Sequence, residues 1–202
     1  MILGAGAAMM LVGGISWAWV GGAIGAAAGL LYLVLFVIGY NASRVTYWLN
    51  PWADPLGEGY QLSQSLIAIG SGGLLGVGLG KSQQKFMYLP EEHNDFIFAI
   101  VCEELGLIGA AIIMALFAAL ILRGFWIALH ARDRFGALLV VGFMTLTGLQ
   151  TFLNIAVVTG LVPATGISLP FFSYGGTALL CQLAEMGIVL SVSRQMPAPE
   201  NG

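Results

Sequence analysis

The sequence has very little charge for its length. Only 8% of its 202 residues are charged and 58% are hydrophobic, whereas about a quarter of the residues in an ordinary soluble domain are charged. The first 40 residues carry no charged side chain at all. A soluble core of this size could not bury so much apolar surface, so lipid must solvate much of the chain. The composition excludes an ordinary soluble protein and indicates a membrane protein.

Basic residues and cysteines are also scarce. The seven Lys and Arg residues are scattered and form no basic stripe, which argues against a nucleic-acid partner. Cys102 and Cys181 both lie inside apolar segments, so we interpret them as small hydrophobic side chains rather than as a disulfide. No basic segment precedes the first apolar run, and no cleavage site follows it. We therefore expect the chain to open within a membrane helix, as part of a longer protein, rather than with a signal peptide.

Apolar segments recur along the chain, and a membrane span needs about 20 such residues. The pattern predicts five spans, over residues 2–17, 20–40, 96–122, 135–158 and 177–193. In the second span Gly21, Gly25 and Gly29 repeat every four residues, a spacing that lets another helix approach closely. The predicted fold class is an all-α polytopic membrane protein with about five transmembrane helices, forming a single domain over residues 1–202.

A long segment, residues 41–95, separates the second and third predicted spans, and loops of this length are usually functional. Its stretch GYQLSQSLIAIGSGGLLGVGLG is apolar but broken by glycines. This pattern is typical of short amphipathic or re-entrant helices that dip into a bundle or lie on the membrane surface.

Arginines mark the opposite side of the membrane. Arg123, Arg132 and Arg134 lie in the short loop predicted over residues 123–134, and Arg194 follows the last span. Dense basic charge in short loops marks the cytoplasmic side. We therefore expect the 41–95 segment to lie outside and the C-terminus to be cytoplasmic.

The sequence EEHND, residues 91–95, is unusually polar for this chain and precedes the third span directly. Acids before a helix are stabilised by its dipole, and Asn94 or Asp95 is a plausible N-cap. Capping does not account for Glu103 and Glu104 inside the span, where ionisable groups are costly and usually face a cavity. We favour a functional role for Asp95. A metal site is an alternative, although no His-x-x-x-His spacing supports zinc.

Three further motifs allow more than one interpretation. GVGLGKS, from Gly76 to Ser82, resembles a phosphate loop, but Leu75 stands where the motif needs its first glycine, so we favour flexible turns. Thr147, Gln150, Thr151 and Asn154 form one polar stripe on the fourth span, suited equally to bonding between helices or to lining a cavity. VPATGISLPFFSYGGT, residues 162–177, predicts a rigid loop that also contributes to a site.

The motifs NPWADPLGEGYQLSQSL, GVGLGKSQQKFMYLPEEHNDFIFAIVCEELGLIG and GLVPATGISLPFFSYGGT, taken together, resemble the SEDS family (shape, elongation, division and sporulation) of peptidoglycan glycosyltransferases. NPWADP and SQQKFMYLP resemble the FtsW/SpoVE branch more than the RodA branch. Family members have about ten spans, so the resemblance covers their C-terminal half. It implies lipid II as substrate, a class B penicillin-binding protein transpeptidase as partner, and a site on the outer face of the bacterial cytoplasmic membrane.

The resemblance also implies that Asp95 is the essential acid, and Asn94 replaces the threonine common before it. Since the attacking sugar hydroxyl must lose a proton, a carboxylate at this place suits a general base. The leaving pyrophosphate needs cations, which Arg44, Lys81 and Lys85 supply on this side, with a divalent cation (Mg²⁺ or Mn²⁺) as an additional source. No cofactor is certain. The candidate substrate-binding residues, which lie in or beside these motifs, are Arg44, Gln61, Lys81, Lys85, Glu91, His93, Ser173 and Tyr174.

Two other classes of function remain open at this point. Broken spans and a polar stripe are also features of a transporter of lipid-linked cell-wall precursors. Against that, the charge gathers at one membrane face, whereas a transport path carries polar groups across the full depth. A non-catalytic membrane scaffold for a transpeptidase is the third class. We expect the 202-residue chain alone to be inactive, because a cavity built from ten helices would lose walls.

Overall fold

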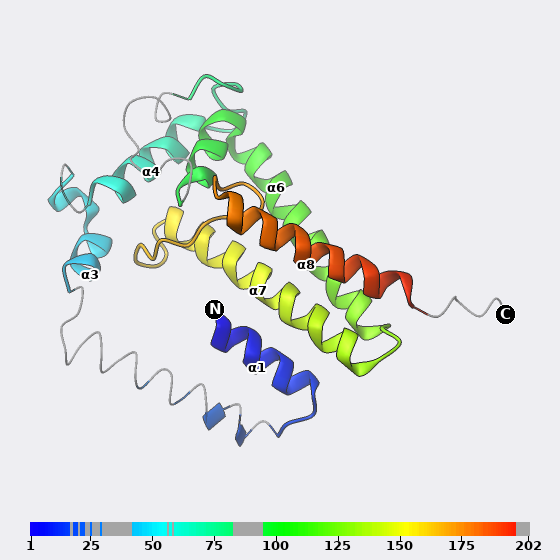
Figure 1. Ribbon diagram of the computed structural model, residues 1–202. Coiled ribbons are helices and arrows are strands. Elements are labelled where there is room, and N and C mark those ends of the chain that lie inside the picture. The colour runs from blue at the N-terminus through cyan, green and yellow to red at the C-terminus, as the bar shows by residue number, and fades with distance from the viewer. Residues whose placement is uncertain are drawn as a thin grey trace. The chain divides into compact units, whose positions relative to one another are not determined.

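A computed structural model describes residues 1–16, 18–19, 21–22, 25, 29, 42–55, 57, 59–82 and 95–196. Every regular element in these ranges is helical, which confirms the all-α class (Figure 1). The elements are α1 (Ile2–Val12), α3 (Ala42–Leu49), the 3₁₀ helix η2 (Pro51–Ala53), α4 (Tyr60–Gly72), α6 (Ile97–Leu129), α7 (Arg134–Val158) and α8 (Gly176–Arg194).

Three helices in the described part are long and apolar enough to cross a membrane, namely α6, α7 and α8. They correspond to the last three predicted spans. The first predicted span, residues 2–17, becomes the shorter apolar helix α1, which ends at Val12 before Gly13 and Gly14. The second, residues 20–40, lies largely outside the described residues. The glycines of its repeat, Gly21, Gly25 and Gly29, are described and exposed, and a methyl group added at any of them would meet nothing within 4 Å in the described part of the chain. Three of the five predicted spans are thus confirmed by length and composition.

The predicted loop over residues 123–134 is shorter than expected, because α6 continues through Arg123 to Leu129. The Arg123 guanidinium stacks over the Trp126 ring, 4.1 Å from its centroid, so the charge remains on the helix surface. The backbone N–H of Gly136 donates to the Asp133 carboxylate at 2.8 Å, at the start of α7. Only residues 130–133 connect the two helices.

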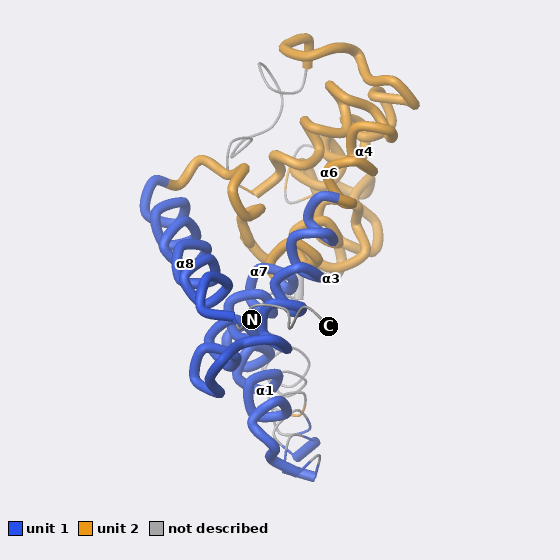
Figure 2. Tube along the Cα trace, turned by 90° about the vertical axis from the view of Figure 1, so that its right-hand side faces the viewer, with its two compact units in different colours: residues 1–28, 116–149, 176–202 blue, residues 29–115, 150–175 orange. Residues whose placement is uncertain are grey.

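The chain divides into two compact units, coloured separately in Figure 2. Unit 1 comprises residues 1–28, 116–149 and 176–202, and unit 2 comprises residues 29–115 and 150–175. Each therefore contains one end of α6 and one end of α7. The prediction of a single membrane domain stays a prediction.

Unit 1 is an apolar helix bundle. Val140, Val141 and Met144 of α7 form a buried cluster with Ile127 and Ala128 of α6 and Val189 of α8. Glycines bring its helices close together: a methyl group added at Gly124 would lie 2.1 Å from Sδ of Met144, and one added at Gly142 would lie 2.8 Å from Sδ of Met9. Small residues at helix crossings are how membrane helices pack when lipid removes the hydrophobic driving force.

Unit 2 contains the short helices predicted within the long segment. The amphipathic helix α4 buries Leu62, Ser63, Ser65, Ala68 and Gly72 along one side, and the hydroxyl of Ser65 donates to the carbonyl of Val158 at 2.8 Å. From α3, Trp48 Nε1 donates to the carbonyl of Gly160, also at 2.8 Å. Both bonds reach the C-terminal end of α7, where the last carbonyls of a helix lack partners within the helix. These two hydrogen bonds therefore attach α3 and α4 to the C-terminal end of α7.

Candidate functional site

Asp95 lies two residues before the first helical residue of α6, Ile97, and is partly buried. The position directly before the helix belongs to Phe96, which is 3% exposed. A methyl group added at Gly166 would lie 3.5 Å from Oδ2 of Asp95, so the loop after α7 runs beside the carboxylate. Gly166 has a φ of +64°, a conformation that suits glycine. Two motifs about 70 residues apart in the sequence thus meet at Asp95.

Asn154 joins these two motifs. Its Nδ2 donates to the carbonyl of Asp95 at 2.7 Å and to the carbonyl of Ile167 at 2.6 Å. The side chain is fully buried. At this position the polar stripe of α7 therefore bonds to loop backbone rather than to another helix, and the choice between the two interpretations of the whole stripe stays open.

Gln150, one turn earlier on α7, also donates a hydrogen bond to the loop after α7. Its Nε2 donates to the carbonyl of Ser168 at 3.1 Å. Further along, the backbone N–H of Leu169 donates to the hydroxyl of Ser173 at 2.7 Å, and Phe171 has a positive φ of 64°. These bonds satisfy irregular backbone beside a membrane helix, as such backbone requires. The prediction that this loop is rigid agrees with them.

Helix α6 is broken at Gly106, whose φ of 68° and ψ of −172° are not helical. The glycine-rich segment after α4 pairs with this break through four backbone hydrogen bonds. Val77 and Gly78 donate to the carbonyls of Glu103 and Glu104 at 3.0 and 3.1 Å, while Leu107 and Ile108 donate to the carbonyls of Gly73 and Leu74 at 2.9 and 3.2 Å. The two backbone segments approach so closely that only glycine fits, because a methyl group at Gly106 would lie 2.3 Å from the nitrogen of Gly76.

This pairing explains the GVGLGKS motif. A phosphate loop needs its backbone N–H groups turned toward the anion, but here the N–H groups of Val77 and Gly78 are bonded to carbonyls of α6. The glycines therefore serve a close backbone contact. The interpretation against a nucleotide-binding loop agrees with this geometry, although the contact is firmer than the flexible turns expected from the sequence.

The two acidic residues inside α6 lie at the same break. Glu103 is 3% exposed and accepts a hydrogen bond from the hydroxyl of Ser82, which is 2% exposed. In the described part, Oε1 of Glu104 is buried without a hydrogen-bond partner. Ser82 directly follows Lys81, so the bond to Glu103 fixes the backbone next to an exposed cation.

The structure places the other predicted site residues as follows. Gln61 is partly buried in the first turn of α4, Lys81 is exposed, Ser173 is partly buried and Tyr174 is 85% exposed. Arg44 belongs to α3, but its side chain lies outside the described residues. Lys85, Glu91 and His93 also lie outside them. Asp95 is therefore the member of EEHND that can be placed, and it meets the residue 162–177 loop.

A metal centre finds no support among the residues that the structure describes, where no three His, Cys, Asp or Glu side chains gather. Because the first four residues of EEHND are outside that part, the possible metal site there stays untested. The carbonyl of Asp95 accepts from the amide of Asn154, and its carboxylate lies beside Gly166.

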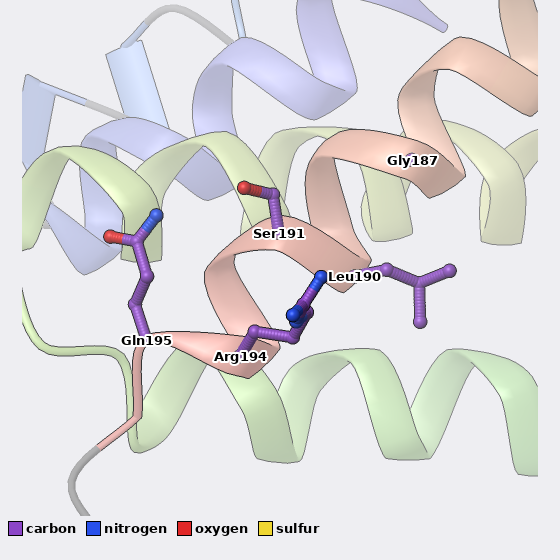
Figure 3. A pocket seen from close by; sticks show the side chains of 5 residues that line it. All are labelled: Gly187, Leu190, Ser191, Arg194 and Gln195. Atoms are coloured by element: carbon purple, nitrogen blue, oxygen red, sulfur yellow. The ribbon is translucent and has the colours of Figure 1, made fainter.

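A pocket on α8 contains none of the predicted site residues. It is lined by residues of the last turns of the helix and by the residue that follows them, namely Gly187, Leu190, Ser191, Arg194 and Gln195 (Figure 3). It lies in unit 1, whereas Asp95 lies in unit 2. We assign it no part in the candidate site.

Several residues of the site were missed in the sequence. Gly106 and Ser82 carried no recognised signal, although a glycine inside an apolar span often marks a close backbone approach. Asn154 was recognised as polar but not as a contact of Asp95. A buried amide facing an acid 59 residues away cannot be found from periodicity.

Comparisons with known proteins converge on one family. The chain is 55% identical over 155 residues to stage V sporulation protein E of Bacillus subtilis, covering 77% of this chain and 42% of that protein. It is 49% identical over 166 residues to the probable peptidoglycan glycosyltransferase FtsW of Geobacter metallireducens, covering 82% and 44%. With the peptidoglycan glycosyltransferase MrdB of Escherichia coli it shares 44% identity over 187 residues, covering 91% and 50%. The chain thus spans about half the length of these curated relatives.

Solved structures give the same result. A structure reported for the coordination of polymerization and crosslinking by a peptidoglycan synthase complex matches with a TM-score of 0.74 and 30% identity, covering 96% of this chain and 54% of that one. A mutant of the rod shape determining protein RodA of Thermus thermophilus matches with a TM-score of 0.61 and 28% identity, covering 97% and 49%. The family model of the FtsW/RodA/SpoVE cell cycle proteins matches residues 1–197. The chain belongs to this SEDS family of multi-pass membrane proteins, whose members include peptidoglycan glycosyltransferases.

Proposed function

We propose that the chain works in a peptidoglycan glycosyltransferase that polymerises lipid II, with Asp95 as the general base. One observation carries the proposal: a partly buried carboxylate stands at the mouth of an apolar helix, with its backbone bonded to Asn154 and its oxygen facing the loop at Gly166. Ionisable groups in such places are costly and mark function. Because its relatives are about twice as long, we propose that the 202 residues act together with further spans.

The reaction joins a sugar hydroxyl of one lipid-linked disaccharide to the anomeric carbon of another, whose lipid pyrophosphate leaves. The hydroxyl loses its proton as it attacks, and Asp95 takes this proton. An α-linked donor gives a β-linked product, so the hydroxyl and the pyrophosphate lie on opposite sides of the anomeric carbon. The base and the groups that neutralise the pyrophosphate then stand across a gap from each other.

Cations are needed for the leaving pyrophosphate. Lys81 is exposed, and its backbone is held beside the buried Ser82–Glu103 hydrogen bond. We propose that Lys81, together with Lys85 and Arg44, binds the pyrophosphate, while Gln61, Glu91, His93, Ser173 and Tyr174 contribute to binding the rest of lipid II. A divalent cation, Mg²⁺ or Mn²⁺, is a second source of charge in this proposal. A chelator separates the two sources, because turnover that depends on the lysines alone survives it.

The proposed partner is a class B penicillin-binding protein transpeptidase. Its support is the similarity to a chain from a complex reported to coordinate polymerization and crosslinking. Joining the two activities on one face of the membrane would bring new strands directly to the crosslinking enzyme.

We propose an orientation from the arginines. Arg132 lies in the short α6–α7 connection, Arg134 begins α7 and Arg194 ends α8, so the positive-inside rule favours the cytoplasmic side for both helix ends. The segment before α6 then faces outside, where the flipped substrate lies. Single cysteines replacing Ala53 and Arg132, in a protein lacking Cys102 and Cys181, test this with a membrane-impermeant thiol reagent on intact cells. Position 53 should react and position 132 should not, and the reverse pattern would separate Asp95 from the substrate.

Product analysis distinguishes the functional classes. The protein expressed from its complete reading frame is purified, reconstituted in vesicles and given lipid II. A polymerase yields glycan strands, a transporter moves intact lipid II between leaflets, and a scaffold does neither. Glycan strands support the proposal, and either other outcome contradicts it. Two of the four residues of the polar stripe that favoured a transport path, Gln150 and Asn154, donate hydrogen bonds to loop backbone, which supports the polymerase proposal.

A further inference from the structure

The buried amide of Asn154 has a fixed orientation. Its nitrogen lies 2.7 Å from the carbonyl oxygen of Asp95 and 2.6 Å from that of Ile167. Only the NH₂ group can donate to two carbonyls, so the amide cannot be turned around. The side chain is fully buried and rises from α7, a regular helix, so its position is set by a rigid element.

Both carbonyls that Asn154 binds belong to irregular backbone. Asp95 precedes the first residue of α6 by two positions, so its carbonyl stands outside the hydrogen-bond ladder of the helix. Ile167 follows Gly166, the residue whose Cα faces the Asp95 carboxylate. One amide therefore determines where the acid and the loop opposite it stand relative to each other.

We infer that Asn154 is a positioning residue for Asp95, fixing the base against the 162–177 loop in the geometry that turnover needs. The inference rests on the proposed function, because it assigns Asn154 a role in the same reaction. Asn154 touches neither substrate nor reacting atoms in this account and acts through residue 95. Displacing a catalytic group by about 1 Å can cost about a hundredfold in rate.

Gln150 provides a matched control. It lies one turn away on the same helix and donates to the same loop, at the carbonyl of Ser168, but it makes no hydrogen bond to residue 95. Leucine at either position removes the donor and keeps a branched side chain of similar length. It leaves the Ser168 carbonyl without its partner at position 150, and the Asp95 and Ile167 carbonyls at position 154. A role limited to holding the loop predicts similar effects for Asn154→Leu and Gln150→Leu. A role in positioning Asp95 predicts an effect on turnover for Asn154→Leu alone.

The experiment measures kcat and KM for lipid II, with the protein from the complete reading frame in vesicles, alongside the thermal midpoint of each variant. Asn154→Leu should lower kcat by about tenfold or more while KM changes by less than about threefold, and Gln150→Leu should keep kcat within about threefold. Asn154→Ser, which retains one hydroxyl donor, serves if the leucine variant does not fold. Equal losses of kcat in the Asn154 and Gln150 variants would overturn the inference.

A double-mutant cycle separates this inference from the proposed function. Because Asn154 acts through Asp95, Asn154→Leu should cause no further loss of the residual turnover in an Asp95→Asn background. A full additional loss there contradicts the inference while leaving Asp95 as the base. Normal turnover by Asp95→Asn alone contradicts the proposed base, and with it any positioning role for Asn154.

Discussion

The two units of this chain are stabilised by different interactions. In unit 1, apolar side chains of α1, α6, α7 and α8 pack around Met144, and glycines such as Gly124 and Gly142 let methionines fit against helix backbone. In unit 2, side chains bond to backbone: Trp48 and Ser65 reach the end of α7, and Asn154 reaches the carbonyl of Asp95, two residues before α6.

The difference follows from what each region must do. A regular helix satisfies its own backbone, so helices in lipid need only shape complementarity to pack. Broken backbone beside a membrane must be satisfied by neighbouring groups, and unit 2 contains the break at Gly106 and the loop after α7. The acid proposed as the base lies among these irregular segments, where a side chain can be presented away from a helix axis. Polar bonding in unit 2 thus surrounds the residue proposed as the base.

The largest effect on stability should come from filling the break in α6. Gly106→Ala adds a methyl group that would lie 2.3 Å from the nitrogen of Gly76 and 2.6 Å from the carbonyl of Leu74, all rigid backbone. Loss of the paired bonds and strain at positive φ should cost about 3 kcal/mol or more, a fall of roughly 6–12 °C in thermal midpoint. Gly187→Ala on α8, where a methyl group meets nothing within 4 Å, is the control and should change little.

Packing in unit 1 should show the next largest effect. Met144 is fully buried among apolar side chains, and Met144→Ala leaves a cavity beside Gly124. We expect a loss of about 2 kcal/mol, at the low end for a buried methionine because lipid replaces water as the reference solvent. Met114, which is 38% exposed, is the comparison. If Met114→Ala lowers the thermal midpoint as much as Met144→Ala, the account of a packed core in unit 1 is wrong.

A smaller effect should follow from removing one polar bond in unit 2. Ser65→Ala leaves the buried carbonyl of Val158 without its donor and should cost about 1 kcal/mol, measured by thermal unfolding in detergent. Ser71→Ala is matched, because that hydroxyl is exposed and bonds to the carbonyl of Ala68 in its own helix. It should cost close to nothing. Equal losses would mean that the bond from α4 to α7 does not stabilise unit 2.

The sequence predicted the positions of the long apolar helices. Apolar runs located α6, α7 and α8 to within a few residues, except where α6 continued past Arg123. The charge of Arg123 suggested a loop. Its long side chain instead stacks on Trp126, which keeps the guanidinium at the surface while the helix continues. The division into two units could not be foreseen, because it depends on contacts between segments far apart in the chain.

The site was only partly accessible. The motifs predicted that the 162–177 loop contributes to a site, but not that Gly166 of this loop lies beside the Asp95 carboxylate. The means of holding them together was not predictable, since Asn154 was one of four polar residues on a stripe that suited bonding and cavity lining equally. The backbone pairing at Gly106 could not be predicted either. A glycine in a sequence indicates conformational freedom, whereas the segment that approaches its backbone is known only from the structure.

The most direct test of the central claim is glycan polymerisation by Asp95→Asn. Asparagine keeps the size of the side chain and leaves the bond from Asn154 to the backbone carbonyl intact, but it cannot accept the proton at neutral pH. With lipid II and the protein from its complete reading frame, turnover should fall by about a hundredfold or more, with an unchanged thermal midpoint. Asp54→Asn, another partly buried aspartate in the segment before α6, should retain turnover. Near-normal glycan strands from a folded Asp95→Asn protein would contradict the account.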